Sequence, residues 1–249
     1  MTTLQEFNDY GKELEQLLTL KTSPIAVKLL EKEADIPKEA IRPKRDLGIH
    51  MAQCQAFAMS RRDGATVAML KEDSWCFAPL IAYGLVDVPT KKEVQMFVNF
   101  PKLERGKYIG IVSAPLKSAT FIPDVVHIYT DNSQLRTLLM PSHYIGREDR
   151  VNYHFFPPDC AYTVVPVLET GKYMIAIPDP GNYMRALAGD GEIIFAVRGD
   201  KLRGVVEGQR GLEERKAGHS SYHMMMRGDF DRPDFYKELF KDWGLQAEP

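Results

Sequence analysis

The sequence predicts an α+β fold, a single compact domain over residues 1–249 in which helices pack on a mixed sheet. Three observations lead to this prediction. The chain has 249 residues, of which 44% are hydrophobic, and this is enough for one large core. Short β-branched runs of strand length alternate with segments of helical period. No segment has the low-complexity composition that is typical of a linker between domains.

The predicted helices have apolar residues at three- and four-residue spacing. The first, Thr3–Leu18, begins with Thr3 and Glu6 at the spacing of a capping box. The last, Asp234–Trp243, has Phe235, Leu239, Phe240 and Trp243 on one face. The other helices are expected over His50–Arg61, Trp75–Tyr83, Lys91–Phe100 and Gln134–Met140, with one more beginning at Lys201.

The predicted strands are short apolar runs bounded by Pro, Gly or Asp. Val125–Tyr129 is the strongest, and it leads into Asp131, a residue type suited to cap the helix that follows. The other strands are expected over Ile25–Leu30, Ala65–Leu70, Tyr108–Val112, Thr163–Leu168, Lys172–Ile177 and Glu192–Arg198. The aromatic-rich segment Pro141–Asp159 has no clear period, so we expect a long loop there.

The charge balance and the hydropathy pattern exclude several classes of protein. Lys and Arg number 32 against 34 for Asp and Glu, a net charge of −2, whereas nucleic-acid binders usually carry a basic excess. No apolar run approaches the roughly 18–20 residues of a membrane span. Charged residues Glu6, Asp9 and Lys12 near the start are unlike a signal peptide. We therefore expect a cytoplasmic protein with no nucleic-acid or membrane partner.

Common catalytic and cofactor motifs are missing from the sequence. It has no P-loop, no G-x-G-x-x-G after a strand, no H-E-x-x-H, no G-x-S-x-G and no C-x-x-C. These absences argue against ordinary nucleotide binding, zinc proteolysis, serine hydrolysis and thioredoxin-type chemistry.

Three cysteines remain as candidates for chemistry. Cys54 and Cys76 lie near the starts of predicted helices, where a thiolate is stabilised, and Cys160 follows the irregular segment. Three thiolates could hold three irons of a [4Fe–4S] cluster and leave the fourth iron open to a ligand. Zinc, with a histidine or water as the fourth ligand, is an alternative, and so is plain burial of the three thiols.

Several segments around these cysteines resemble the DUF169 family, a set of uncharacterised proteins mostly from anaerobic bacteria and archaea. They are Cys54–Ala58, Arg61–Gly64, Cys76, Ala114–Leu116, Phe121, Pro123–Val126, Tyr129 and Gln134. The resemblance spans about Ser23 to Arg198, and the chain departs from it in a C-terminal extension, 211–249. Family members are similar in carrying cysteines where Cys54 and Cys76 stand. The resemblance implies a shared cysteine site and no particular reaction.

Histidines and aromatic residues are the second set of candidates. Tyr153, His154 and Phe155 lie just before Cys160, so we expect them to cover a bound cofactor or ligand. His50 stands one helical turn before Cys54, and it is either a further metal ligand or a solvent-exposed side chain. His219 and His223 have the same spacing beside Met224–Met226, although that segment reads more simply as a loop.

These observations favour a thiolate–metal protein. Cys54, Cys76 and Cys160 are the predicted ligands of an iron–sulfur cluster with one open site for a small molecule. The alternative is a binding protein without metal, with an apolar pocket lined by Tyr153, Phe155, Phe156 and the methionine run. A contact between copies through the C-terminal helix is a third interpretation. The sequence leaves open the substrate and whether the protein is an enzyme.

Overall fold

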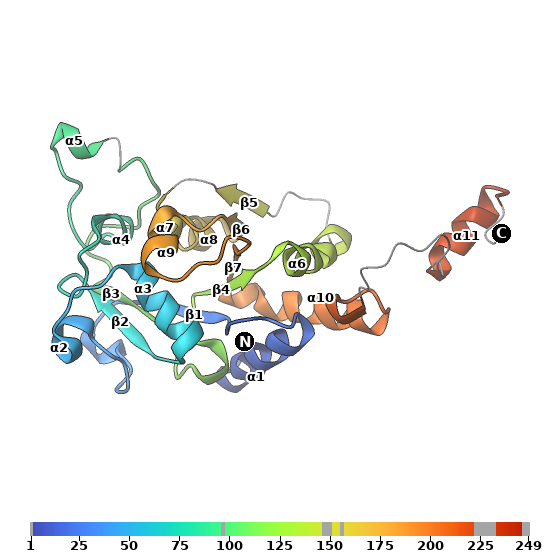
Figure 1. Cartoon of the computed structure of the whole chain (residues 1–249), viewed down its shortest axis with the longest axis horizontal. Helices are drawn as coiled ribbons and strands as arrows, with labels where there is room; N and C mark the ends of the chain where they lie inside the picture. Colours follow the sequence, from blue (N-terminus) through green and yellow to red (C-terminus); the bar gives the residue numbers. More distant parts are fainter. Residues whose placement is uncertain (1, 96–97, 146–150, 155–156, 222–232, 246–249) are drawn as a thin grey trace.

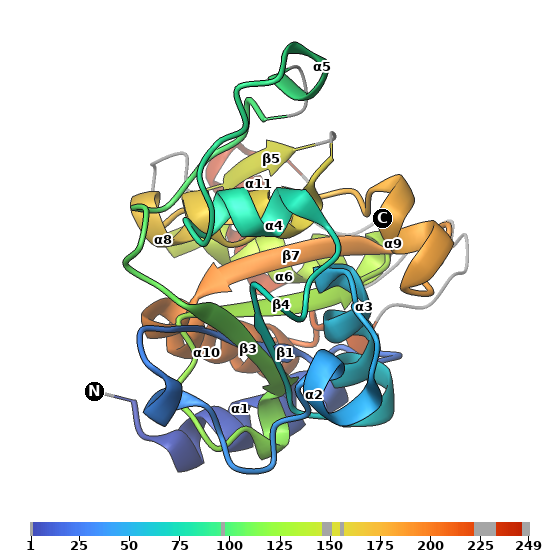
Figure 2. The ribbon, with the colours of Figure 1, turned by 90° about the vertical axis from the view of Figure 1, so that its left-hand side faces the viewer.

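The computed structural model describes residues 2–95, 98–145, 151–154, 157–221 and 233–245. Its strands are β1 (Ile25–Leu30), β2 (Val67–Leu70), β3 (Gly110–Pro115), β4 (Val125–Thr130), β5 (Val151–His154), β6 (Tyr173–Ala176) and β7 (Ile193–Arg198). Within the described residues they form one sheet in the order β2–β3–β1–β4–β7–β6–β5 (Figures 1 and 2). The pairing is antiparallel except between β5 and β6, so the sheet is mixed, as predicted.

Helices cover both faces of this sheet. One face packs against α1 (Leu4–Leu17), α6 (Asn132–Ile145) and α10 (Leu202–Glu214). The other packs against α3 (Gln53–Ala58), α4 (Phe77–Ala82), α7 (Asp159–Tyr162) and α8 (Val165–Thr170). In β1, Ala26 lies in the core on the face covered by α1, α6 and α10, whereas Ile25 and Val27 lie in the core on the opposite face. Central strands that are buried on both faces explain why the sequence shows continuous apolar runs rather than alternation.

Shorter elements connect these layers. They are α2 (Pro43–Leu47), α5 (Lys92–Gln95), α9 (Pro180–Arg185) and α11 (Asp234–Asp242), the 3-10 turns η1 (Glu33–Asp35), η3 (Leu116–Ser118), η4 (Gly199–Lys201) and η5 (His219–Ser221), and the π-helical turn η2 (Met59–Asp63). Helix α11 extends away from the body of the protein, and none of its residues is buried (Figure 1). It confirms the predicted C-terminal helix.

The N-terminal helix forms as its sequence predicts. The hydroxyl of Thr3 accepts a hydrogen bond from the Glu6 N–H, and the Glu6 carboxylate accepts one from the Thr3 N–H, which completes a capping box. The helix packs very closely on η3, because a Cβ placed on Gly11 would lie only 2.6 Å from the Lys117 backbone nitrogen. Glycine at this position therefore lets the two backbones approach.

Three predicted elements are corrected by the structure. The run Thr163–Leu168 is a helix, α8, and not a strand: a proline stands in its first turn and Gly171, with φ +64°, ends it. The helix predicted over His50–Arg61 begins only at Gln53 and continues as the π-helical turn. The helix predicted over Lys91–Phe100 is shortened to α5. The other predicted strands are confirmed, with ends shifted by a few residues.

Part of the segment expected to be a long loop is regular. Helix α6 continues as far as Ile145, and β5 adds a strand at the edge of the sheet. None of the helices in the described ranges is long and apolar enough to span a bilayer.

Candidate functional site

The three cysteines come together where α3, α4 and α7 begin. Cys54 lies in the first turn of α3, Cys76 is the N-cap residue of α4, and Cys160 lies in α7. Cys54 packs in a small apolar cluster with Ala186, and Cys76 lies against that cluster. Cys76 also packs against the larger core that contains Cys160. Cys76 therefore packs between the cluster that contains Cys54 and the core that contains Cys160. The Cys54 and Cys160 side chains are both buried, with 7% and 6% of their surface exposed.

The electrostatics of the thiols place them within reach of one another. Burial is the main cause that raises the pKa of Cys160. Electrostatic interaction with Asp159, Cys76, Asp179 and Cys54 raises it further, because ionised forms of these groups would repel a thiolate at Cys160. Burial likewise raises the pKa of Cys54 to about 12. All three thiols are therefore protonated at neutral pH in the metal-free protein.

Two groups, Arg185 and the Ala78 backbone, oppose the effect of burial and lower the pKa values of these thiols. The guanidinium of Arg185 lowers the pKa of Cys54 by its charge and by a hydrogen bond, and its charge also lowers that of Cys76. A hydrogen bond from the Ala78 backbone further favours the thiolate of Cys76, although burial still leaves its pKa raised. Cys76 is only partly buried, so it is the thiol most accessible from solvent.

A carboxylate pair, buried Asp159 and partly buried Asp179, lies beside the thiols. Asp159 opens α7 and Asp179 is the N-cap residue of α9. Each carboxylate accepts a hydrogen bond from the backbone N–H of the other residue, at 2.9 and 3.3 Å. The Asn182 amide donates to Asp159 at 2.5 Å. Burial, and then the charge of Asp179, raise the pKa of Asp159 to about 7. The pair ties α7, which carries Cys160, to α9, which carries Arg185.

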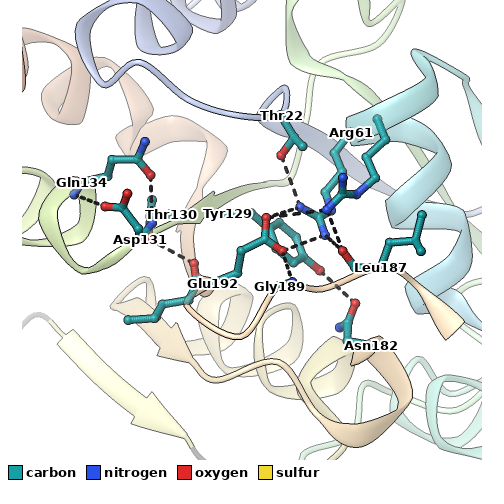
Figure 3. Close-up of polar contacts among 12 residues, drawn as sticks. Thr22, Arg61, Tyr129, Thr130, Asp131, Gln134, Asn182, Leu187, Gly189 and Glu192 are labelled. Carbon is teal, nitrogen blue, oxygen red and sulfur yellow. Dashed lines mark hydrogen bonds and ion pairs between the residues drawn. The ribbon is translucent and has the colours of Figure 1, made fainter. Parts of the chain in front are cut away.

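A buried arginine extends this polar cluster to the sheet (Figure 3). Arg61, in η2, donates to both carboxylate oxygens of Glu192 at 2.8 and 3.0 Å, and its guanidinium lies 3.9 Å from the ring centre of Tyr129. The Tyr129 hydroxyl donates in turn to Asn182 at 3.5 Å. Arg61 also donates to the Leu187 carbonyl, just beyond α9. A chain of polar contacts therefore runs from the β4 strand to the carboxylates beside the thiols.

His127 is a further fully buried titratable group on this face of the sheet. Its Nε2 lies 3.1 Å from the Thr163 carbonyl, so we assign the proton to Nε2, and its ring meets Phe57 edge to face. Burial lowers its pKa to about 4, and it is therefore neutral at physiological pH. Its role in this arrangement is to join β4 to the end of α7.

The other predicted site residues are more scattered. Tyr153 is 71% exposed on the edge strand β5, and the His154 ring stacks on Tyr162, two residues after Cys160. Phe155, Phe156, His223 and Met224–Met226 lie outside the described residues. His50 precedes α3 and is exposed, so it does not share a helical face with buried Cys54. In the described ranges, no three His, Cys, Asp or Glu side chains are positioned to ligate one metal ion.

Sequence reasoning missed most of the polar residues around the thiols. Asp159 directly precedes Cys160, and Asp179 lies in an Asp-Pro-Gly sequence that is typical of a turn. Arg61 lies in one of the segments that resemble the family, but its partner Glu192 is 131 residues away. Asn182 and Arg185 belong to no motif. The local signal for a helix start is the sequence Asp179-Pro180-Gly181, because Asp is a favourable N-cap residue and Pro is favourable in the first turn.

The structure also contains a cavity of about 530 Å³ away from the cysteines. Phe7, Pro123, Leu168, Arg198 and Arg203 are among its lining residues. Its two arginines are each paired with a carboxylate, Arg198 with Asp200 and Arg203 with Glu6. The cavity and the thiol cluster are therefore separate features.

Comparison with known protein families identifies the family of this chain. A family model for DUF169, described as uncharacterised ArCR, COG2043, matches residues 13–208. The match includes all three cysteines, both carboxylates and Arg61, and it ends before α11. No curated protein and no solved structure matches the chain significantly.

Proposed function

The chain belongs to the DUF169 family, and from that premise we propose that Cys54, Cys76 and Cys160 form one site that binds a thiophilic metal centre, an iron–sulfur cluster in the first place. The observation that supports the proposal is the convergence of three thiols from three separate segments. Each thiol lies within electrostatic reach of the others or packs against the same clusters. Free cysteines that serve only to fill a core have no reason to gather in this way.

The chemistry of the donor set agrees with this proposal. Thiolates are the ligands of iron–sulfur clusters, and three of them leave one iron available for an outside ligand. The positive charge of a bound metal lowers the pKa of a thiol, so binding releases the protons that burial retains in the metal-free protein. Arg185 and the Ala78 N–H already favour the thiolate of Cys76.

Binding requires a change in the positions of the thiols. Because no preformed group of three ligands lies in the described ranges, the sulfur atoms must approach one another. Cys76 is the least buried of the three and caps a short helix, so we expect its side chain to move most. The Asp159–Asp179 pair and the Arg61 contacts hold the surrounding backbone in place.

The test is a metal and acid-labile sulfide analysis of protein expressed and purified without oxygen. We expect iron and sulfide, with a broad absorption band near roughly 400 nm, and loss of both in Cys54→Ser, Cys76→Ser and Cys160→Ser. Met51→Leu is the matched control, since it removes a buried sulfur atom that is not a thiol.

Two other results have defined meanings. Zinc without sulfide would retain the thiol site but exclude the cluster. Absence of any bound metal after attempted reconstitution, or equal metal content in the three cysteine variants and the wild type, would refute the proposal.

A further inference from the structure

Arg185 is a cation beside the thiols that has no carboxylate partner. It is the last residue of α9 and is exposed, and its guanidinium acts on both Cys54 and Cys76. Across the described part of the chain, no carboxylate oxygen lies within 4.0 Å of it, whereas Arg42, Arg61, Arg198, Arg203 and Arg210 are all in ion pairs. Asp179 lies nearby but outside ion-pair distance, so the guanidinium of Arg185 has no direct carboxylate contact and can bind a ligand.

The position of this guanidinium is defined by its neighbours. Its central carbon lies 4.7 Å from the ring centre of Trp75, the residue before Cys76. A Cβ on Gly181 would overlap both Arg185 Nη2 and Asp179 Oδ1, so the glycine leaves the space that the guanidinium occupies. The side chain is therefore held between an indole ring and the first turn of its own helix.

Large apolar side chains are exposed on the same elements. Trp75 is 50% exposed and Phe77, which follows Cys76, is 42% exposed. Met184 and Leu187, close to Arg185 in the chain, are also exposed. Exposed aromatic and aliphatic groups beside an unpaired cation are the pattern expected of a ligand-binding surface.

We propose that Arg185 and Trp75 form the recognition part of the thiol site, and that its ligand is a small organic anion with an apolar or aromatic body. The guanidinium binds the anionic group through paired N–H donors, and the exposed face of Trp75 packs against the apolar body. This inference rests on the proposed function, because it names the ligand class of the same thiol site. The cavity near Arg198 offers no equivalent, since both of its arginines are neutralised.

The thiols themselves supply the test. In reduced, metal-free protein the thiolate sulfur displaces iodide from iodoacetate, an anion, or from iodoacetamide, which is neutral, and forms a carbon–sulfur bond with release of iodide. Because the same thiolate attacks both reagents, the ratio of the two rates at Cys76 is independent of its pKa. Mass spectrometry of the Cys76 peptide gives both rates, and free cysteine gives the reference ratio.

We expect the iodoacetate-to-iodoacetamide ratio at Cys76 to exceed that of free cysteine and to fall about fivefold in Arg185→Met, the effect of one nearby charge at low salt. Arg185→Lys keeps the charge and is expected to retain most of the ratio. Arg203→Met is the matched control, because it removes an arginine from the opposite side of the sheet. Benzoate is expected to protect Cys76 in the wild type and not in Arg185→Met, and benzamide is expected to protect neither.

An unchanged ratio in Arg185→Met, or an equal fall in Arg203→Met, would overturn the inference. Equal protection by benzoate and benzamide would also overturn it, because the anionic group would then have no part in binding. The metal content of Arg185→Met is measured separately. If the wild-type protein binds no metal, the proposed function is refuted. The alkylation ratio still tests separately whether Arg185 favours an anionic ligand.

Discussion

The buried ion pair between Arg61 and Glu192 allows a quantitative prediction. The Arg61 side chain is fully buried and that of Glu192 is 13% exposed, and two hydrogen bonds join them. Removal of one member of such a pair typically costs about 3–5 kcal/mol, because a buried charge is left without its partner. Glu192 retains some contact with water, so we expect Arg61→Met to lower the free energy of unfolding by about 3–4 kcal/mol.

The pH dependence of that loss follows from the carboxylate. Burial acts to raise the pKa of Glu192, but hydrogen bonds from Arg61 and Gly189 and the charges of Arg61 and Arg62 outweigh burial and lower it. The pair therefore stabilises the fold above the ordinary pKa of Glu, and this contribution is lost as the pH falls through the lowered value. In Arg61→Met the pKa of Glu192 is expected to rise. The penalty should then be largest at neutral pH and decrease on acidification.

A double-mutant cycle measured by urea denaturation is the assay. Glu192→Gln is expected to cost about 3 kcal/mol, because it leaves the Arg61 charge buried. The double variant, Arg61→Met with Glu192→Gln, is expected to cost little more than either single variant, which gives a coupling energy of about 2–3 kcal/mol. Additive costs, or a cost below about 1 kcal/mol for Arg61→Met, would refute the reasoning.

Three further predictions concern other parts of the fold. As the pH falls from about 6.5 to about 4, the free energy of unfolding of the wild type should decrease by up to about 1.4 kcal/mol per pH unit, because His127 takes up a proton in the unfolded chain but stays neutral in the fold. His127→Gln should lack this decrease, so equal pH profiles of the two proteins in urea denaturation would contradict the prediction. Gly11→Ala should destabilise the protein by about 1–3 kcal/mol, because the added methyl group would clash with the backbone of η3. Gly204→Ala, in an open position of α10, should stabilise it by about 0.5–1 kcal/mol. Thermal unfolding compares the two variants, and a shift of both midpoints in the same direction would be inconsistent with the packing. Deletion of residues 233–249 should leave the midpoint of thermal unfolding unchanged, because α11 buries nothing; a lower midpoint would mean that the helix packs on the body.

Sequence reasoning succeeded where local signals and burial agree. Thr3–Leu18 combines a capping box with an apolar stripe, and the structure has the helix from Leu4 to Leu17. The sequence predicts the strand Ile25–Leu30 with its observed bounds, because a β-branched run between a proline and charged residues has few alternatives. The strand predicted over Thr163–Leu168 is wrong, because a short and mostly buried apolar segment has no usable period. The proline in its first turn and Gly171 after it were the signals for helix.

The candidate site was predictable only in part. Cys54 and Cys76 stand at helix starts that sequence patterns can locate. Their surroundings depend on contacts across the fold, such as Arg61 with Glu192, which are 131 residues apart. Such pairs leave no trace in one sequence, since each residue alone resembles an ordinary surface charge.

The order of the strands in the sheet determines how long β1 waits for its partner during translation. Strand β1, which lies between β3 and β4 in the sheet, is made first, but its partner β3 follows about 80–90 residues later. At about 5–20 residues per second, a ribosome takes on the order of 4–17 s to supply that partner. Throughout this interval β1 lacks the strand β3 with which it pairs, and α1 lacks η3, on which it packs. We therefore expect apolar surface of the N-terminal segment to stay exposed, and open to chaperones, at least until β3 has left the exit tunnel.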